Sequence, residues 1–404
     1  MRLMITGAIL ALLSAGLGYY LTEGETLTVE AFLDRHWQRP IGPQGPLPDG
    51  FTDHEGSLAP AECASCHPRQ WEDWRTSLHH RTVSAGLTWQ LHLMNQSEAN
   101  QCLDCHAPLA EQKALLAMRF DWPGAPGQTP PAYVPGDLDQ QGLVCAACHV
   151  RRHQRFGPQP RNEPLPGPQP HKGFTVHPAF SDSRFCVTCH QFPAQGPRVN
   201  GKLQEDTYAQ WQASPAAAEG RQCQDCHMPD RRHLWRGIHD PEMVRTAVRA
   251  ELEVTPVEGR FQITASLRNV DVGHLFPTYM VPKVVMTLTL LQPNGETMRL
   301  GQSVIGWQVN VDLNRELADT RIAPGERHRL QAWTEAESGT VVLEVAVAPR
   351  EHYERMFKQM MQQAEKLSPA VLGLLETAYT EARATRYELL RLQKLLPPGR
   401  RIAN

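Results

Sequence analysis

Hydrophobic and polar positions alternate most regularly between residues 248 and 349. Alternation with a period of two is typical of strands that bury one face, and Asn294-Gly295 is a favourable hairpin turn between two such runs. We therefore predict an antiparallel β-domain, a small sandwich, in this part of the chain. The apolar positions of the clearest runs are Phe261, Ile263, Ala265 and Leu267, then Met286, Leu288 and Leu290, then Leu343, Val345 and Val347.

The pattern becomes helical in the last segment, residues 350–404. One helix is predicted over residues 351–367, and Ser368-Pro369 has the residue types of an N-cap and a first helical position. A second helix is predicted from there to about Leu396. Its apolar positions follow the helical period, so we expect them to pack on the preceding region or on a partner. These positions are Leu372, Leu375, Tyr379 and Ala382.

The region before residue 248 has a different character. Two of its segments, residues 122–137 and 157–170, contain too many prolines for long helices or central strands and are predicted to be loops. The whole chain has 404 residues, enough for two or three domains, with 33 prolines. Its mean hydropathy of -0.43 also indicates a loop-rich protein. Something other than long apolar elements must therefore fill much of this region's interior.

The cysteines indicate what fills it. All ten fall in five copies of Cys-x-x-Cys-His, the attachment signature of c-type haem. Two thiols one helical turn apart form thioethers with the haem vinyl groups, and the adjacent histidine ligates the iron. The cysteine pairs are Cys63 and Cys66, Cys102 and Cys105, Cys145 and Cys148, Cys186 and Cys189, and Cys223 and Cys226, and the histidines are His67, His106, His149, His190 and His227.

Zinc and disulfides explain these motifs less well than haem does. Four thiolates suffice for one zinc ion, and neither zinc nor a disulfide framework accounts for a histidine after every second cysteine. We therefore predict five covalently attached haems c, with porphyrin filling much of the interior of residues 61–247. The motifs begin at residues 63, 102, 145, 186 and 223, and this near-even spacing suggests one haem per local unit. The predicted fold is mixed: a loop-rich and helical multihaem domain, the β-sandwich and the C-terminal helices.

Residues 1–22 are predicted to be a signal peptide or an uncleaved membrane anchor, followed by a polar linker over residues 23–60. The nineteen uncharged residues from Leu3 to Leu21 are close to the ~20 needed to span a bilayer, and no clear cleavage site follows them. Arg2 precedes this segment and acidic residues follow it, so the body is expected outside the cytoplasmic membrane. Haem is attached to c-type cytochromes in that same compartment. We expect an exported protein on the periplasmic side of the membrane.

The charge balance gives no sign of a nucleic-acid partner. The formal net charge is -3 at pH 7, and each haem would add two propionate carboxylates, offset in part by its ferric iron. The holoprotein is therefore expected to be acidic, unlike a nucleic-acid-binding protein with a basic surface. The sequence does not indicate an oligomeric state.

Each iron has a second axial position, which another histidine can fill. Thirteen of the eighteen histidines lie outside the motifs. His79 lies twelve residues beyond His67, about 18 Å along a helix, so it would serve a neighbouring iron. The further candidates are His171 and His177 before the fourth motif and His233 and His239 after the fifth, with His92 and His153 less favoured. His274 lies in a turn of the β-domain and, taken alone, would be assigned a structural or solvated role.

Four stretches form a specific combination: Cys63–Pro68 with Trp74, Ser77 and His79, then residues 207–214, 223–229 and 273–278. Together they resemble the multihaem cytochromes related to the tetrahaem electron acceptor of hydroxylamine oxidoreductase. The resemblance covers roughly residues 61–290. It implies close-packed haems with largely bis-histidine ligation, and it makes His79 and His274 distal ligands. The present chain has five motifs and a β-domain, so ligand pairing cannot be transferred from the tetrahaem relative.

Two functions are compatible with these features. The first is an electron carrier, and the second is a multihaem oxidoreductase that acts on a small nitrogen or sulfur compound at one open haem. All five motifs end in histidine, without the lysine found in some multihaem nitrite reductases, and the surplus histidines can close every site. These observations favour the carrier. Its partners are expected to be redox proteins, such as a quinol-oxidising membrane complex or a terminal reductase.

Overall fold

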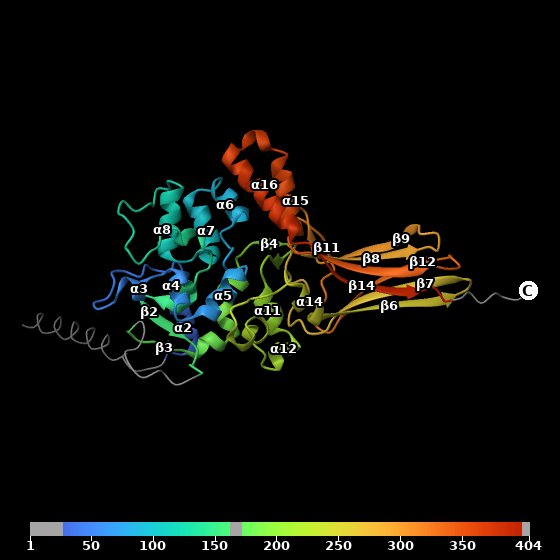
Figure 1. Cartoon of the computed structure of the whole chain (residues 1–404), viewed down its shortest axis with the longest axis horizontal. Helices are drawn as coiled ribbons and strands as arrows, with labels where there is room; N and C mark the ends of the chain where they lie inside the picture. The colour runs from blue at the N-terminus through green and yellow to red at the C-terminus, as the bar shows by residue number, and fades with distance from the viewer. Residues whose placement is uncertain (1–26, 162–171, 398–404) are drawn as a thin grey trace, which may run out of the picture.

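The computed structural model describes residues 27–161 and 172–397. The molecule is elongated, with a helical body at one end and a β-domain at the other, and a pair of helices projects where the two meet (Figure 1). The predicted signal or anchor segment and His171 lie outside the described residues. Within the described part, no helix is both long and apolar enough to cross a membrane.

The body consists of short helices joined by loops (Figure 1). Prolines at the first helical positions and side-chain caps set their limits, as in the capping box of Asn95 and Glu98 at the start of α7. The helices are α2 (Val29–His36), α3 (Asp53–Gly56), α4 (Pro60–Ala64), α5 (Pro68–Thr76), α6 (Ala85–Leu91), α7 (Gln96–His106), α8 (Ala110–Arg119), α9 (Cys145–His149), α10 (Val187–His190), α11 (Thr207–Gln212), α12 (Pro215–Ala218), α13 (Cys223–His227) and α14 (Pro241–Ala247).

Short 3₁₀ turns and small strands complete the body. The described residues of both predicted loops are irregular, in line with their proline content. The turns are η1 (Leu138–Gln140), η3 (Pro178–Ser181), η4 (Ser183–Cys186) and η5 (Pro229–Arg231), and the strands are β1 (Val150–Arg151), β2 (Gln154–Gly157), β3 (Thr175–Val176), β4 (Arg198–Val199) and β5 (Lys202–Leu203).

The side-chain core of the body is divided into separate clusters. One surrounds Trp74 and Leu138, and Trp74 also donates from its indole nitrogen to the carbonyl of Leu143 at 2.7 Å. Another surrounds Leu91 and Leu103, between helices α6, α7 and α8. Because the helices do not share one continuous side-chain core, the space between the clusters is available for other groups.

The predicted β-sandwich is confirmed. Two antiparallel sheets, with strand orders β14-β13-β8-β9, where β14 is Tyr387–Leu395, and β12-β7-β6, enclose one apolar core that contains the alternating residues of the three predicted runs. Residues 292–296, with Gly295 at positive φ, connect β8 to β9 as the hairpin signal predicted. The strands are β6 (Val248–Val257), β7 (Arg260–Asn269), β8 (Lys283–Leu291), β9 (Thr297–Ile305), β12 (Arg327–Thr334) and β13 (Thr340–Ala348), with a separate ribbon of β10 (Trp307–Val309) and β11 (Glu316–Asp319).

The prediction of a second C-terminal helix reaching Leu396 is wrong in its last part. The helix α16 (Pro369–Ala384) ends early, and strand β14 (Tyr387–Leu395) pairs antiparallel with β13. The apolar residues of this stretch fit either period, and the unpaired edge of β13 decides between them by offering backbone partners. Leu389 enters the core of the sandwich as a result.

The C-terminal helices pack on the body, one of the two positions expected for them. Helix α15 (Glu351–Met361), turn η6 (Ala364–Lys366) and α16 form a hairpin, and Ser368 accepts a hydrogen bond from the backbone nitrogen of Val371 as its N-cap. Its apolar face surrounds Trp89 of α6. Lys202 of the body also bonds Glu316 at 2.8 Å and Asp319 at 2.6 Å on β11. The β-domain is thus fastened to the body at more than one point.

Leu343→Ala is expected to destabilise the β-domain by about 2–5 kcal/mol, because it leaves a cavity between the two sheets. Leu395→Ala removes the same atoms from a side chain that is 73% exposed. This control should change the free energy of unfolding by less than about 0.5 kcal/mol. Denaturation followed by far-ultraviolet circular dichroism measures both values. Equal losses in the two variants would contradict the assigned core.

Candidate haem sites

Each motif is formed by a short helix or a helix junction. The second motif lies at the end of α7, and the third and fifth motifs form the whole of α9 and α13. The fourth motif spans η4 and α10, and the first lies at the junction of α4 and α5. A helical turn places both cysteines of a motif on one face, as two thioethers to one porphyrin require. All ten cysteines are free thiols. A zinc site would need four ligands around one ion, whereas the described residues contain no group of three or more histidine, cysteine or acidic side chains placed to hold a metal.

Thiols of different motifs contact one another. The thiol of Cys63 in the first motif lies close enough to that of Cys145 in the third to lower the pKa of Cys63. The second motif meets the fourth through Cys105 and Cys189, and the guanidinium of Arg39 lies 3.4 Å and 3.6 Å from these two sulfur atoms. Cys186 and Cys223 connect the fourth motif to the fifth in the same way. These contacts define a first group with motifs one and three, and a second group with motifs two, four and five.

Backbone carbonyls fix the tautomer of the motif histidines. The Nδ1 atoms of His106, His149 and His227 lie 2.9, 2.8 and 2.6 Å from the carbonyl oxygens of Thr82, Phe156 and Arg236, respectively. A proton on Nδ1 that is donated to a carbonyl leaves the lone pair on Nε2, which is the arrangement of a histidine that ligates a metal. These residues therefore fit the haem iron that the motifs imply.

Three motif histidines each face a second histidine from a distant part of the chain. The ring centres are 6.4 Å apart for His190 and His79, 6.1 Å for His149 and His233, and 6.4 Å for His227 and His274. A metal–imidazole bond of about 2.0 Å places two axial rings on one iron with their centres about 6 Å apart. Each pair is therefore spaced for one iron, and the rings of His227 and His274 are nearly parallel, at 6°.

Burial favours the neutral form of the partner histidines, and two of the three are oriented like the motif histidines. Burial lowers the pKa of His79 to about 3 and that of His274 to about 4, and a neutral imidazole is the form that binds a metal. Nδ1 of His233 lies 3.0 Å from the carbonyl oxygen of Arg231, and that of His274 lies 2.8 Å from the oxygen of Leu275. Nδ1 of His79 is buried without a hydrogen-bond partner.

His274 is held by the contact between its loop and the body. Gln210 of α11 accepts hydrogen bonds from the backbone nitrogen of Leu275 and from the hydroxyl of Thr278. Gly273 does not have a positive φ, and its role is close approach: a Cβ atom there would lie 3.0 Å from the Cβ of Ala216. The loop therefore brings a histidine of the β-domain against the last haem motif.

His233 is held by an ion pair between a buried aspartate and a partly exposed arginine. Asp73 of α5 accepts two hydrogen bonds from the guanidinium of Arg232, at 2.7 and 2.5 Å, and a third from the backbone nitrogen of His233 at 3.0 Å. Asp73 is only 3% exposed, and the hydrogen bonds from Arg232 lower the pKa of its carboxyl group although burial opposes them. Neither residue was singled out from the sequence, because an aspartate in a helix and an arginine in a loop give no signal before they meet.

The structure does not place His177, which the sequence predicts to ligate iron, opposite a motif histidine. Its Nε2 lies 3.0 Å from the carbonyl oxygen of Leu27, and its Nδ1 accepts a hydrogen bond from the backbone nitrogen of Ala179. Its ring stacks on Phe32, with centres 3.8 Å apart. A neutral imidazole that donates through one nitrogen and accepts through the other has no lone pair left for a metal. His177 is an N-cap in this structure.

The remaining candidates are not paired with a motif histidine in the described contacts. His239 is half-buried, and burial together with Arg350 lowers its pKa to about 4. The less favoured His153 contacts the carbonyl of Gly45, and His92 packs against Phe120. Among the histidines of the described ranges, none is in ring contact with His106.

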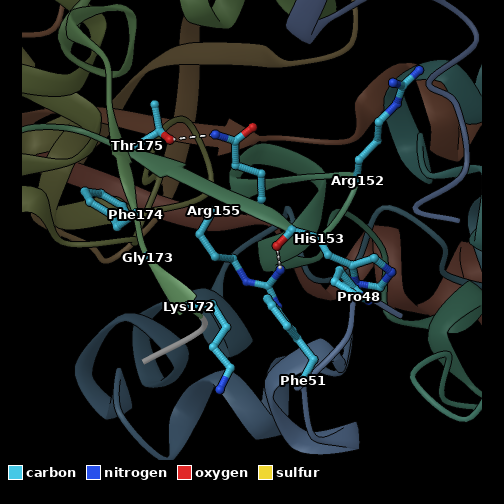
Figure 2. Close-up of a pocket in the computed structure, with 10 residues that line it drawn as sticks. Pro48, Phe51, Arg152, His153, Arg155, Lys172, Gly173, Phe174 and Thr175 are labelled. Atoms are coloured by element: carbon cyan, nitrogen blue, oxygen red, sulfur yellow. Dashed lines mark hydrogen bonds between the residues drawn. The ribbon is translucent and has the colours of Figure 1, made fainter. Parts of the chain in front are cut away.

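A basic hollow of about 360 Å³ lies between the segments of residues 152–155 and 172–175 (Figure 2). Arg152, Arg155 and Lys172 line it, and Arg155 donates to the carbonyl of His153 at 2.8 Å. Burial lowers the pKa of Arg155, and the nearby thiol of Cys63 opposes this shift only in part. Three cations at this place are suited to carboxylates, which haem carries as propionates.

Paired thiols followed by histidine, with further imidazoles at the spacing of axial ligands, are the features of multihaem c-type cytochromes. Residues 62–121 match the family model of cytochrome c554 and c-prime. The fold is similar to that of a penta-heme cytochrome c552 from Thermochromatium tepidum, with a TM-score of 0.59 and 18% identity, covering 86% of this chain and 100% of that one. These comparisons support the multihaem cytochrome c family.

Two further comparisons give no additional information about the family of this chain. No curated protein sequence matches the chain. A structural genomics target, SoR45, is 14% identical over 25% of this chain and 73% of that chain, and its TM-score of 0.17 carries no argument.

His177→Ala should leave the ferric haem spectrum of the protein unchanged, because neither ring nitrogen is available to iron. Loss of the two hydrogen bonds should lower the free energy of unfolding by about 1–3 kcal/mol. Absorption and electron paramagnetic resonance spectra test the first expectation, and denaturation tests the second. A new high-spin haem in this variant would restore His177 as a ligand.

Proposed function

We propose that the chain is a pentahaem c-type cytochrome that transfers electrons between redox proteins outside the cytoplasm. The observation that carries this proposal is the set of three histidine pairs at the spacing of axial ligands. When bound, each haem supplies an iron that takes up and releases one electron. A histidine on each side leaves no position for substrate and favours electron transfer over small-molecule chemistry.

The ligand assignment in this proposal pairs His149 with His233, His190 with His79, and His227 with His274. His171 and His239 stay predictions for the irons on the first and second motifs. The three cations around the hollow of Figure 2 would hold propionates of the haem on Cys63 and Cys66.

The chain's own residues orient and shield the irons. Backbone carbonyls hold the imidazole tautomers, Asp73 and Arg232 hold the loop of His233, and Gln210 holds the loop of His274. The contacts between thiols of different motifs support close-packed haems, because attachment points that touch bring the rings near one another. Proximity of this kind is what a chain of electron carriers requires.

The proposal includes the location and the partners. Export follows from the covalent haem and the N-terminal segment, which would act as a signal peptide or an anchor. The donor would be a redox protein such as a quinol-oxidising membrane complex, and the acceptor a further redox protein or terminal reductase. A relation to the tetrahaem acceptor of hydroxylamine oxidoreductase belongs to this same proposal.

A second candidate function has one observation in its favour. His106 has no histidine ring opposite it within the part of the chain that the structure describes, although its own tautomer is set for metal binding. The haem on Cys102 and Cys105 would then keep an open position and could act on a small nitrogen or sulfur compound. This enzyme and the carrier differ in the spin state of one iron.

The spectrum of the ferric protein separates these two functions. A pure carrier should contain five haems, all of them low-spin, by mass spectrometry and electron paramagnetic resonance. An open site should give one high-spin haem in five, and a variant with Cys102→Ala and Cys105→Ala should lose that signal together with one haem. A high-spin signal that persists in this variant would place the open iron on another motif. Fewer than five haems in the wild type, produced with a working attachment system, would contradict the proposal itself.

His274→Ala should convert one of the five haems to high spin and allow it to bind carbon monoxide when reduced, because the iron loses its second imidazole. The other four should keep their signals. His328→Ala is the matched control, since His328 lies in the same β-domain and bonds the hydroxyl of Ser303. An unchanged ferric spectrum and no carbon monoxide binding in the His274 variant would show that this residue ligates nothing.

A further inference from the structure

Trp235 lies between two of the partner histidines. Its ring centre is 4.6 Å from that of His79 at an interplanar angle of 72°, and 5.0 Å from that of His233 at 84°. His79 faces the histidine of the fourth motif, and His233 faces that of the third. By the thiol contacts described above, the third motif belongs to the first group and the fourth motif to the second group. One indole therefore touches the distal sides of two haem sites, one in each group.

The backbone of Trp235 is strained in a way that serves this position. Its φ is 42°, in the left-handed region that a bulky side chain rarely adopts, and Asp230 and Arg231 have φ values of 55° and 57°. Such conformations persist only where the surrounding structure determines them. Here the ion pair of Arg232 with the buried Asp73 fixes the middle of the loop. The strain and the ion pair together hold the indole edge-on to both imidazoles.

We propose that Trp235 is a positioning residue that fixes the plane of His79, supports that of His233 beside its hydrogen bond to the Arg231 carbonyl, and joins the two groups of haems. This inference rests on the proposed function, because it takes both histidines as distal ligands. In the transfer that it assists, one ferrous iron loses an electron and one ferric iron gains it. Trp235 itself is neither oxidised nor reduced, and no proton moves.

Edge-to-face contact gives the indole control over the ring planes. A histidine that ligates iron through Nε2 can still rotate about that bond, unless a hydrogen bond or a neighbour prevents it. Nδ1 of His79 has no hydrogen-bond partner, so packing must hold this ring, and Trp235 is its nearest described aromatic contact. The plane of an axial imidazole sets the g values of a low-spin ferric haem, which makes its rotation measurable.

The competing explanation is that Trp235 only fills space, since it also packs against the apolar cluster around Trp74. Trp71 provides the matched control: it packs against the same cluster, and its described ring interaction is with Arg75. Trp235→Leu removes the ring contacts with both histidines, while Trp235→Phe keeps a smaller ring. Trp71→Leu removes an indole of equal size from the same cluster.

Electron paramagnetic resonance of the ferric holoproteins tests the inference. In Trp235→Leu we expect two of the five low-spin signals to shift in g value without becoming high-spin, and electron equilibration between the two groups after rapid reduction to slow. In Trp235→Phe the same two signals should shift less, and in Trp71→Leu none should shift. Wild-type g values for all five haems in Trp235→Leu, or in Trp235→Phe should the leucine variant not fold, would overturn the inference. Shifts of the same size in Trp71→Leu would also overturn it.

Two further variants, His79→Ala and His233→Ala, show whether a negative result concerns only the role of Trp235 or the proposed function as well. Each should produce one high-spin haem if the ligand assignment holds. Absence of a high-spin haem in both would contradict the assignment itself, whatever the signals of the Trp235 variants. High-spin signals in both, with Trp235 variants identical to wild type, would leave the assignment standing and remove only the role of Trp235.

Discussion

The organisation of the body fits the demands that an iron held from both sides, as proposed, would make on the chain. Attachment through two thioethers needs only a short helical turn, and the sequence supplies it five times. The opposite axial position demands more, because a neutral imidazole must arrive from elsewhere with its Nε2 pointing inward. Backbone carbonyls, the ion pair of Asp73 and Arg232, and one inter-domain loop would meet this demand at His233 and His274. Regular secondary structure is correspondingly short in this region, and side-chain cores are small and separate.

The β-domain has its own conventional core, and yet it is part of the haem-bearing unit. Its loop around His274 reaches the fifth motif, its ribbon is fastened to Lys202, and the C-terminal helices that follow it cover Trp89. A domain that served only as an appendage would not need a glycine to approach Ala216 so closely. The packing of this domain against the body therefore orients the imidazole of His274 toward the fifth motif.

The sequence predicted those features that depend on local chemistry. The motifs, the alternation of strands β7, β8 and β13, and the Ser368 cap each require only neighbouring residues, and all of them appear at the expected positions. The sequence was less informative where the partner lies far away. His177 has the same local surroundings as a ligand would, but Leu27 and Ala179 occupy its nitrogens, and β14 became a strand because β13 had a free edge. Asp73 and Trp235 had no signal at all, since their roles exist only once two distant loops meet.

The long separation between paired histidines has a consequence for how the protein matures. His79 precedes His190 by more than one motif, and His274 follows the entire haem-bearing region. With these pairs as ligands, each iron would act as a reversible cross-link, and closing long loops is where such links restrict the unfolded chain most. Thioether attachment can proceed motif by motif on an open chain, whereas the last cross-link must wait for the β-domain to be exported and folded. A truncated or stalled product would therefore retain its covalent haems and lack its final coordination, which gives the cell a chemical distinction between finished and unfinished molecules.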